Sequence, residues 1–434
     1  MEFYTVLAGD TLYAIGLAYN VSPQAIADVN GLNMAEPLVT GMNLVIPIEE
    51  ADTEITYRVE PGDTLYSIAQ QFNISVNDLI SLNALTYPFD LSVGQTLIIR
   101  SRDEARAESP IETFGYYLPV SDPDNFLINS LGQYLTYLGI FDFPVTASGQ
   151  IIGTIDADTL AAANNMGIGV FPVLTNLQEG EFNSDLGRAI VSNEETLNTL
   201  TDNIMVFLGE YNLPGVMIDF ENLYPEDRDL FTNFIRLLYQ RLHSENKLLG
   251  VNIAAKWEDL PDRPWAGFFD YSALAPYMDL AAIMTYEWGW QAGPPSPTAP
   301  LPFVRRVLDY AIASNIPANN IVMGLTNYGY NWSLPYEPSN RATTVTLERI
   351  WEIGRTYNAP IIFDEEVKQP FMDYTDARGI QHRAWFEDAL SHYYKYQLVQ
   401  EYGLRGVFYW TINLPLTATW YIVSNMFNIE PFIS

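Results

Sequence analysis

Residues 1–100 contain a tandem repeat, which limits the possible folds of this 434-residue chain more than any other feature. The run V-x-x-G-D-T-L-Y occurs at Val6–Tyr13 and again at Val59–Tyr66, and Asn30 and Asn83 follow at the same spacing. A spacing kept over the whole unit indicates a duplicated module with no net insertion. We therefore predict two small domains, residues 2–48 and residues 55–100.

Within each copy the pattern predicts the order strand, helix, helix, strand. Gly-Asp-Thr supplies a turn and a helix cap, and apolar residues then recur at helical spacing from Leu12. Ser22-Pro23 and Ser75-Val76 are expected to begin the second helix of each copy. Val45–Pro47 and Leu97–Ile99 are expected to close the two units as short strands.

From about Ile111 onward, apolar runs alternate with longer helical patterns, which is typical of β/α units. The helical patterns include Asp227–His243, Phe303–Ser314 and Asp388–Tyr402. The candidate strands are Thr113–Leu118, Tyr134–Phe141, Ile168–Val173, Gly215–Glu221, Leu249–Ala254, Leu280–Tyr286, Ile321–Tyr328 and Gly406–Trp410. This α/β pattern predicts a (β/α)8 barrel over residues 110–434, with its active site at the carboxyl ends of the strands.

One segment of the predicted barrel is too long to be a single connection. It covers residues 333–385, after the seventh candidate strand. We expect a small inserted lobe there, with strands near Thr343–Leu347 and Phe371–Tyr374.

The fourth candidate strand, G-V-M-I-D-F-E, ends in two acids separated by one residue. Successive side chains on a strand alternate between faces, so Asp219 and Glu221 should point the same way. Two acids at the end of an apolar strand are costly to bury unless they are used or paired. On spacing alone, a solvated or salt-bridged pair of acids explains the pattern equally well.

Composition narrows the class of partner. The chain has 53 acidic and 21 basic residues, a formal net charge of −32, which disfavours nucleic acid and anionic membranes. An aromatic content of 14% with few cations fits a neutral ring-shaped ligand such as a sugar. No cysteine is present and the three histidines are scattered, so we expect no metal and no cofactor.

The chain also lacks the sequence marks of export and membrane insertion. Its first residues have neither the basic start nor the apolar stretch of a secretory signal. No apolar run approaches the ~20 residues needed to cross a bilayer. We therefore expect a protein that is made without a secretory signal peptide and does not insert into a membrane.

The repeat resembles the LysM domain, a module that binds glycans containing N-acetylglucosamine, such as peptidoglycan and chitin. In that family the sugar lies against the loop after the first strand and the loop before the last strand. The resemblance therefore implies glycan-binding positions in both copies: Gly9, Asp10, Thr11, Leu12 and Asn30 in the first, and Gly62, Asp63, Thr64, Leu65 and Asn83 in the second.

The larger domain resembles family 18 glycoside hydrolases, in particular the LysM-bearing glucosaminidases of bacterial spores. G-V-M-I-D-F-E matches the end of the family signature D-G-x-D-x-D-x-E, and M-T-Y-E at Met284–Glu287 matches M-x-Y-[DE]. Trp410 ends strand eight, where the family forms the floor of its sugar pocket.

This resemblance implies a role for each matched residue. Glu221 would be the general acid, Asp219 would orient the substrate's acetamide group, and Tyr286 would hydrogen-bond the acetamide oxygen. Trp410 would stack under the sugar. Four further residues are candidates for substrate binding: Tyr116, Trp288, Glu287 and Asn327.

The signature is incomplete in this chain. Its first aspartate position is Pro214 and its middle aspartate position is Met217. We therefore expect Asp219 to lack an acidic neighbour and to be held by other polar groups.

The leading functional hypothesis is a retaining N-acetylglucosaminidase that cleaves β-1,4 bonds in peptidoglycan, with spore cortex during germination as the expected substrate. LysM modules would anchor this monomeric enzyme to the cortex, the coat or the cell wall. Two alternatives remain: a chitinase, which satisfies the same motifs, and a glycan-binding coat protein whose barrel no longer cleaves.

Overall fold

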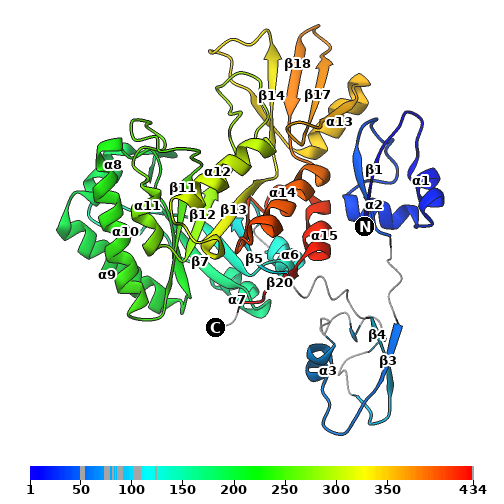
Figure 1. Cartoon of the computed structure of the whole chain (residues 1–434), viewed down its shortest axis with the longest axis horizontal. Coiled ribbons are helices and arrows are strands. Elements are labelled where there is room, and N and C mark those ends of the chain that lie inside the picture. The colour runs from blue at the N-terminus through cyan, green and yellow to red at the C-terminus, as the bar shows by residue number, and fades with distance from the viewer. Residues whose placement is uncertain are drawn as a thin grey trace.

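The structure, a computed structural model, describes residues 1–48, 54–72, 79–80, 83, 85, 91–100, 109–122 and 125–432. Figure 1 shows two small N-terminal modules, a larger α/β barrel and a lobe inserted late in the barrel sequence. Among the described residues, no helix is long and apolar enough to span a bilayer.

The first module has the predicted order strand, helix, helix, strand: β1 (Glu2–Thr5), α1 (Leu12–Tyr19), α2 (Pro23–Asn30) and β2 (Asn43–Ile46). Both helices begin at side-chain caps. Thr11 accepts a hydrogen bond from the Ala14 backbone N–H, and Ser22 accepts one from Ala25. β1 and β2 pair antiparallel and close the module.

In the second module the described elements are β3 (Glu54–Arg58), α3 (Leu65–Gln71) and β4 (Thr96–Arg100). β3 and β4 pair antiparallel. The module has its own apolar core, which includes Val59, Ile68 and Leu97. The helix expected from Ser75-Val76 begins outside the described residues.

Eight parallel strands form a closed barrel in the predicted order. They are β5 (Pro110–Tyr117), β6 (Tyr137–Pro144), β7 (Gly169–Thr175), β10 (Gly215–Asp219), β11 (Leu248–Ala254), β12 (Leu280–Met284), β13 (Ile321–Thr326) and β19 (Gly406–Trp410). The barrel closes where β19 pairs with β5. The short β20 (Asn428–Ile429) pairs in parallel with the first residues of β5. The predicted (β/α)8 barrel is confirmed.

Helices cover the outside of the barrel because their apolar faces are buried against the outer face of the sheet. They are α6 (Phe126–Leu131), α7 (Ala157–Asn165), α8 (Ser184–Val191), α9 (Glu194–Glu210), α10 (Arg228–His243), α11 (Tyr271–Leu274), α12 (Leu301–Ala313), α14 (Ala389–Tyr402) and α15 (Thr417–Met426). A short hairpin of β8 (Leu177–Gln178) and β9 (Glu181–Phe182) follows β7.

Three strands end two residues earlier than predicted. β10 ends at Asp219, β12 at Met284 and β13 at Thr326, so Glu221, Tyr286 and Asn327 lie just beyond the strands. The physical reason is that the ladder hydrogen bonds stop where the chain turns outward at the barrel rim. These residues therefore occupy loops at the carboxyl end of the barrel, where active sites of this fold are built.

The inserted lobe is a five-stranded antiparallel sheet with one helix. Its elements are β14 (Gly329–Leu334), β15 (Thr343–Val345), α13 (Leu347–Tyr357), β16 (Ile361–Asp364), β17 (Gln369–Thr375) and β18 (Gln381–Trp385). The sheet order is β15-β14-β18-β17-β16. The strand expected over Thr343–Leu347 is shorter because Thr346 caps α13 and Leu347 is its first residue.

The first module packs against the lobe and the barrel helices, beside α13 and α15 in Figure 1. The Ile361 backbone N–H donates to the Thr40 carbonyl at 2.9 Å, and Asn43 Nδ2 donates to Asp388 at 2.8 Å. Every residue of β2 is consequently buried, whereas burial alternates over Thr96–Ile99 of β4. One apolar core joins the first module to the lobe.

Candidate active site

Asp219 is the last residue of β10 and is buried at the carboxyl end of the barrel. Burial disfavours its charged form and raises its pKa to about 7, a hydrogen bond with Asn252 opposes that rise, and the charge of Asp142 adds to it. Among the described residues, its Oδ1 atom has no hydrogen-bond partner. Asp219 is therefore a carboxyl group that can change protonation state near neutral pH.

Glu221 lies two residues further on, in the loop that leaves β10. Burial of its carboxyl group raises its pKa well above the usual value, and the charges of Asp219 and Glu287 raise it further. A carboxyl group that keeps its proton in this way can serve as a general acid.

The side chain of Asn176, directly after β7, holds the backbone of Glu221. Asn176 Oδ1 accepts from the Glu221 N–H and Asn176 Nδ2 donates to the Glu221 carbonyl, both at 2.9 Å. Asn176 Nδ2 also donates to the carbonyl of Asn183, at the end of the β8–β9 hairpin. Sequence reasoning missed Asn176, although a polar residue directly after an apolar strand was a signal available in the sequence.

Tyr286 follows β12, and its hydroxyl group is buried close to the ionisable groups of Tyr116, Glu221 and Asp219. With burial as the largest cause, they raise the pKa of Tyr286 well above its usual value, so the hydroxyl stays a hydrogen-bond donor. The ring of Tyr286 packs beside Gly324, where a Cβ atom would lie 2.8 Å from it. Glycine at that position leaves room for the ring.

Trp410 ends β19 and is half-buried. Its ring meets Phe141 edge to face at 4.9 Å and Tyr116 at 5.5 Å. These contacts hold the indole at the same barrel end as Asp219. The structure therefore brings together the four residues that the sequence singled out: Asp219, Glu221, Tyr286 and Trp410.

Two expectations need correction. Asp219 was expected to lack an acidic neighbour, but Asp142, from β6, acts on it electrostatically. Tyr116 was a candidate for substrate binding, which needs an accessible side chain, but it is fully buried and its hydroxyl donates to Asn252 Oδ1. Tyr116 belongs to the aromatic core of the barrel, because its strand position points into the barrel interior.

The other candidate substrate-binding residues have different surroundings. Trp288 is 43% exposed and packs on Trp257 and Phe303, so one part of its ring is free to meet a ligand. Glu287 accepts hydrogen bonds from Tyr328 and Tyr330 at 2.8 and 2.6 Å. Substrate contact by Trp288 and Glu287 stays a prediction.

Asn327 is buried and donates to two backbone carbonyls of the loop after β19, those of Thr411 and Leu414. These bonds fix that loop next to Trp410. The structure therefore shows Asn327 in a supporting position, and direct contact with substrate stays a prediction.

The predicted glycan-binding loops have the same geometry in both modules. Asp10 accepts from the Tyr4 hydroxyl and the Leu7 N–H, and Asp63 accepts from their counterparts Tyr57 and Glu60. Gly9 and Gly62 have φ values of +92° and +98°, a conformation that other residues rarely adopt. Each turn is therefore rigid and leaves its backbone at the surface.

Asn30 and Asn83 are structural ties. Asn30 bonds to the backbone of Ile26 and Val45, and Asn83 bonds in the same way to Leu79 and Ile98. Both ends of each amide group are used within the module. A glycan contact at these two positions stays a prediction. Because both side-chain amides are already hydrogen-bonded within the module, such a contact would involve mainly the backbone.

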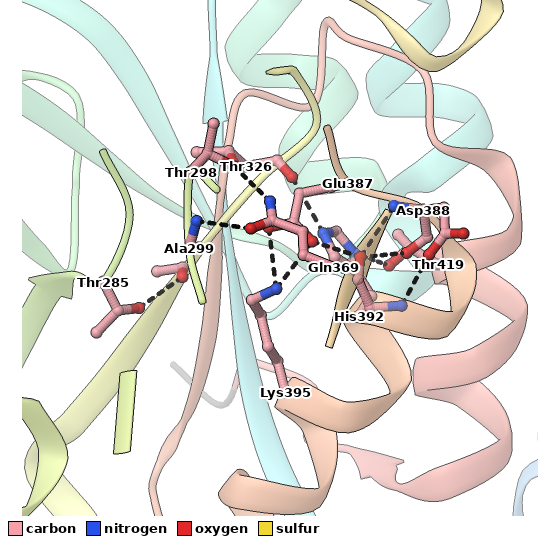
Figure 2. A network of polar contacts seen from close by, with 12 residues as sticks. Thr285, Thr298, Ala299, Thr326, Gln369, Glu387, Asp388, His392, Lys395 and Thr419 are labelled. Atoms are coloured by element: carbon pink, nitrogen blue, oxygen red, sulfur yellow. Dashed lines mark hydrogen bonds and ion pairs between the residues drawn. The ribbon is translucent and has the colours of Figure 1, made fainter. Parts of the chain in front are cut away.

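A buried polar network joins the lobe, α14 and the barrel behind the site (Figure 2). Lys395 Nζ contacts both carboxylate oxygens of Glu387, at 2.9 and 2.8 Å, and Gln369 also donates to Glu387. His392 bonds to Thr419 and to the carbonyl of Thr326, and burial lowers the pKa of His392 to about 3. This neutral histidine connects α14 to the end of β13.

A closed parallel barrel with an acid pair at the end of its fourth strand and an inserted lobe defines a class of glycosidase. The chain belongs to glycosyl hydrolases family 18, whose family model matches residues 180–414. The LysM domain model matches residues 4–47 and 57–100.

Several relatives match this chain over most of its length. The cortical fragment-lytic enzyme of Bacillus subtilis is 33% identical over 423 residues, covering 86% of this chain and 98% of the relative. The cortical fragment-lytic enzyme of Bacillus anthracis is 33% identical over 435 residues, covering 99% of both chains. The crystal structure of the Bacillus cereus spore cortex-lytic enzyme SleL matches with a TM-score of 0.82 at 31% identity, covering 99% of this chain and 98% of that one.

Proposed function

We propose that this enzyme hydrolyses β-1,4 bonds after N-acetylglucosamine in the peptidoglycan of the spore cortex. The observation that carries the proposal is the grouping of Glu221, Asp219, Tyr286 and Trp410 at one end of the barrel. The cortex as substrate is supported by relatives that carry cortex-lytic names and match most of this chain.

Glu221 acts as the general acid, because burial and the neighbouring acids keep its proton in place. It gives this proton to the glycosidic oxygen as the bond to C1 breaks. The acetamide oxygen of the substrate attacks C1 from the opposite side, so the enzyme supplies no nucleophile of its own. Attack by water on the resulting ring, with Glu221 recovering a proton, yields a product of retained configuration.

Asp219 and Tyr286 act on the acetamide group. Ionised Asp219 stabilises the positive charge that develops when the acetamide attacks C1. Tyr286 donates a hydrogen bond to the acetamide oxygen and orients it. Trp410 offers an aromatic face to the sugar ring.

We propose that the two LysM modules anchor the enzyme to the cortex or cell wall. The exposed Gly-Asp-Thr turns at Gly9 and Gly62 support this role. Binding of peptidoglycan, rather than of another N-acetylglucosamine polymer, is the finer part of the proposal.

The test is to incubate the full chain separately with purified cortex, vegetative cell wall and chitin oligomers, and to identify the released ends by mass spectrometry. Cortex fragments ending in reducing N-acetylglucosamine support the proposal. Release of chitobiose without cortex cleavage would show a chitinase, and no product from any glycan would show a binding protein. Glu221→Gln should remove cleavage while retention on sedimented cortex stays unchanged.

A further inference from the structure

Strand four of the barrel lacks the acids that would stand behind Asp219. Met217 is buried in the barrel core and fills the space above Gly250, where a Cβ atom would lie 2.5 Å from the methionine methyl group. An acid next to Asp219 has to come from another strand.

Asp142 reaches this position because β6 is irregular. The register between β6 and β7 shifts between Ile140 and Phe143, which indicates a β-bulge. A bulge re-aims the side chains beside it and occurs often near active sites. Asp142 is the residue within this irregular stretch that carries a carboxylate.

Thr175 places Asp142 next to Asp219. The Thr175 hydroxyl donates to Asp142 Oδ2 at 3.1 Å, and the backbone of Thr175 is the ladder partner of Asp219. Thr175 therefore stands between the two acids, with Asp142 bound to its side chain and Asp219 paired across the ladder. The Asp142 side chain is half-buried, so its charge is only partly screened by water.

We propose that Asp142 is a positioning residue of the active site, which supplies from β6 the carboxylate facing Asp219 that strand four does not carry. This inference rests on the proposed function. The other polar groups acting on or bonded to Asp219 are Asn252 from β11, Tyr116 from β5, Tyr286 from β12 and Glu221 from the following loop.

The charge of Asp142 makes ionised Asp219 less favourable, and catalysis needs Asp219 ionised. The acidic limb of the pH–activity profile therefore follows Asp219, and the basic limb follows loss of the proton from Glu221. Removing the Asp142 charge should let Asp219 ionise at lower pH and move the acidic limb down by about one pH unit.

The experiment measures kcat/KM against pH for four full-length proteins acting on cortex fragments: wild type, Asp142→Asn, Met217→Asp and the double variant. Asp142→Asn keeps an oxygen that can accept from the Thr175 hydroxyl, so we expect this variant to fold. Thermal melting checks that it does. It should move the acidic limb to lower pH. Met217→Asp adds an acid on strand four and should move the acidic limb to higher pH. In the double variant, this second change should reverse the shift that Asp142→Asn causes.

The outcomes separate the two proposals. A folded Asp142→Asn with an unchanged acidic limb would overturn the role of Asp142, whatever happens to kcat. If Asp142→Asn does not fold, Thr175→Val replaces it, because this change removes the hydroxyl that donates to Asp142; an unchanged acidic limb in that variant would overturn the role of Asp142 as well. A wild type that leaves cortex intact would instead refute the proposed function.

Discussion

The side-chain amide of Asn176 holds the backbone of Glu221 by two hydrogen bonds of 2.9 Å, one to the N–H and one to the carbonyl. Glu221, the proposed general acid, lies outside β10, so the strand ladder does not fix it. Asn176 takes over that task from the end of the neighbouring strand β7. Two bonds to one peptide segment restrict both its position and its rotation.

Asn176→Ala should lower kcat by roughly 10- to 100-fold, because a small misplacement of a catalytic group has a cost of that size. KM should change little, since Asn176 makes its bonds to the enzyme backbone. Steady-state kinetics on cortex fragments measure both values. Asn203→Ala is a matched control, because Asn203 on α9 also donates to a backbone carbonyl, that of Gly149. Equal kcat values for the two variants would contradict the prediction.

Asp219 should make the fold less stable as pH rises. Its pKa is about 7 in the folded chain and near the model-peptide value of 3.8 when unfolded. The folded state therefore keeps a proton that the unfolded chain has lost. The stabilisation is complete below the unfolded value and disappears as pH rises through about 7.

Asp219→Asn has no proton to lose at this position. At about pH 8 its free energy of unfolding should exceed that of wild type by an amount on the order of a few kcal/mol. At about pH 4 this difference should be smaller. Calorimetric melting at both pH values measures this. A constant difference in Tm would show that titration of Asp219 is not its source.

The contact between the first module and α14 can be tested with the internal repeat as its own control. Asn43→Ala leaves buried Asp388 without its donor from the module, which should cost about 1–3 kcal/mol of unfolding free energy. Thr96 occupies the same place in the second module and is exposed. Thr96→Ala should change stability by less than about 0.5 kcal/mol in urea unfolding. Similar losses in both variants would contradict the docked arrangement.

The buried Lys395–Glu387 pair predicts a larger effect (Figure 2). Lys395→Met should cost about 3–5 kcal/mol, because it leaves a buried carboxylate without its cation. Adding Glu387→Gln should recover most of this loss, since the amide still accepts from Gln369 and carries no charge. The single variant should also regain stability at low pH, where Glu387 becomes protonated. Urea unfolding of wild type, Lys395→Met, Glu387→Gln and the double variant measures the coupling, and additive losses would argue against it.

The barrel could be predicted from the sequence because buried parallel strands leave apolar runs, and those runs located all eight strands. Asp219 and Glu221 stood out because acids are rare at the end of such a run. Strand ends were less predictable: hydrogen-bond ladders, which the residue pattern does not record, decide that β10 stops at Asp219.

Contacts between distant segments were beyond the sequence pattern. Asp142 lies near Asp219 because of a bulge in β6, and Asn176 at the end of β7 bonds to Glu221 at the end of the neighbouring strand β10. The burial of Tyr116 also depends on closure of the barrel. The same limit applies to the first module, whose strand β2 reads like β4 in the repeat but is covered by another domain.

That covered strand has a consequence for how the enzyme would cut its substrate. The hydrogen bonds of Asn43 and Thr40 restrict rotation of the first module, so the turn at Gly9 is held in one orientation relative to Glu221 while these contacts last. A glycan strand bound at that turn would be presented to the acid with one polarity and one offset. The first module would then work as a molecular ruler, and fragments released from long strands would cluster at one length.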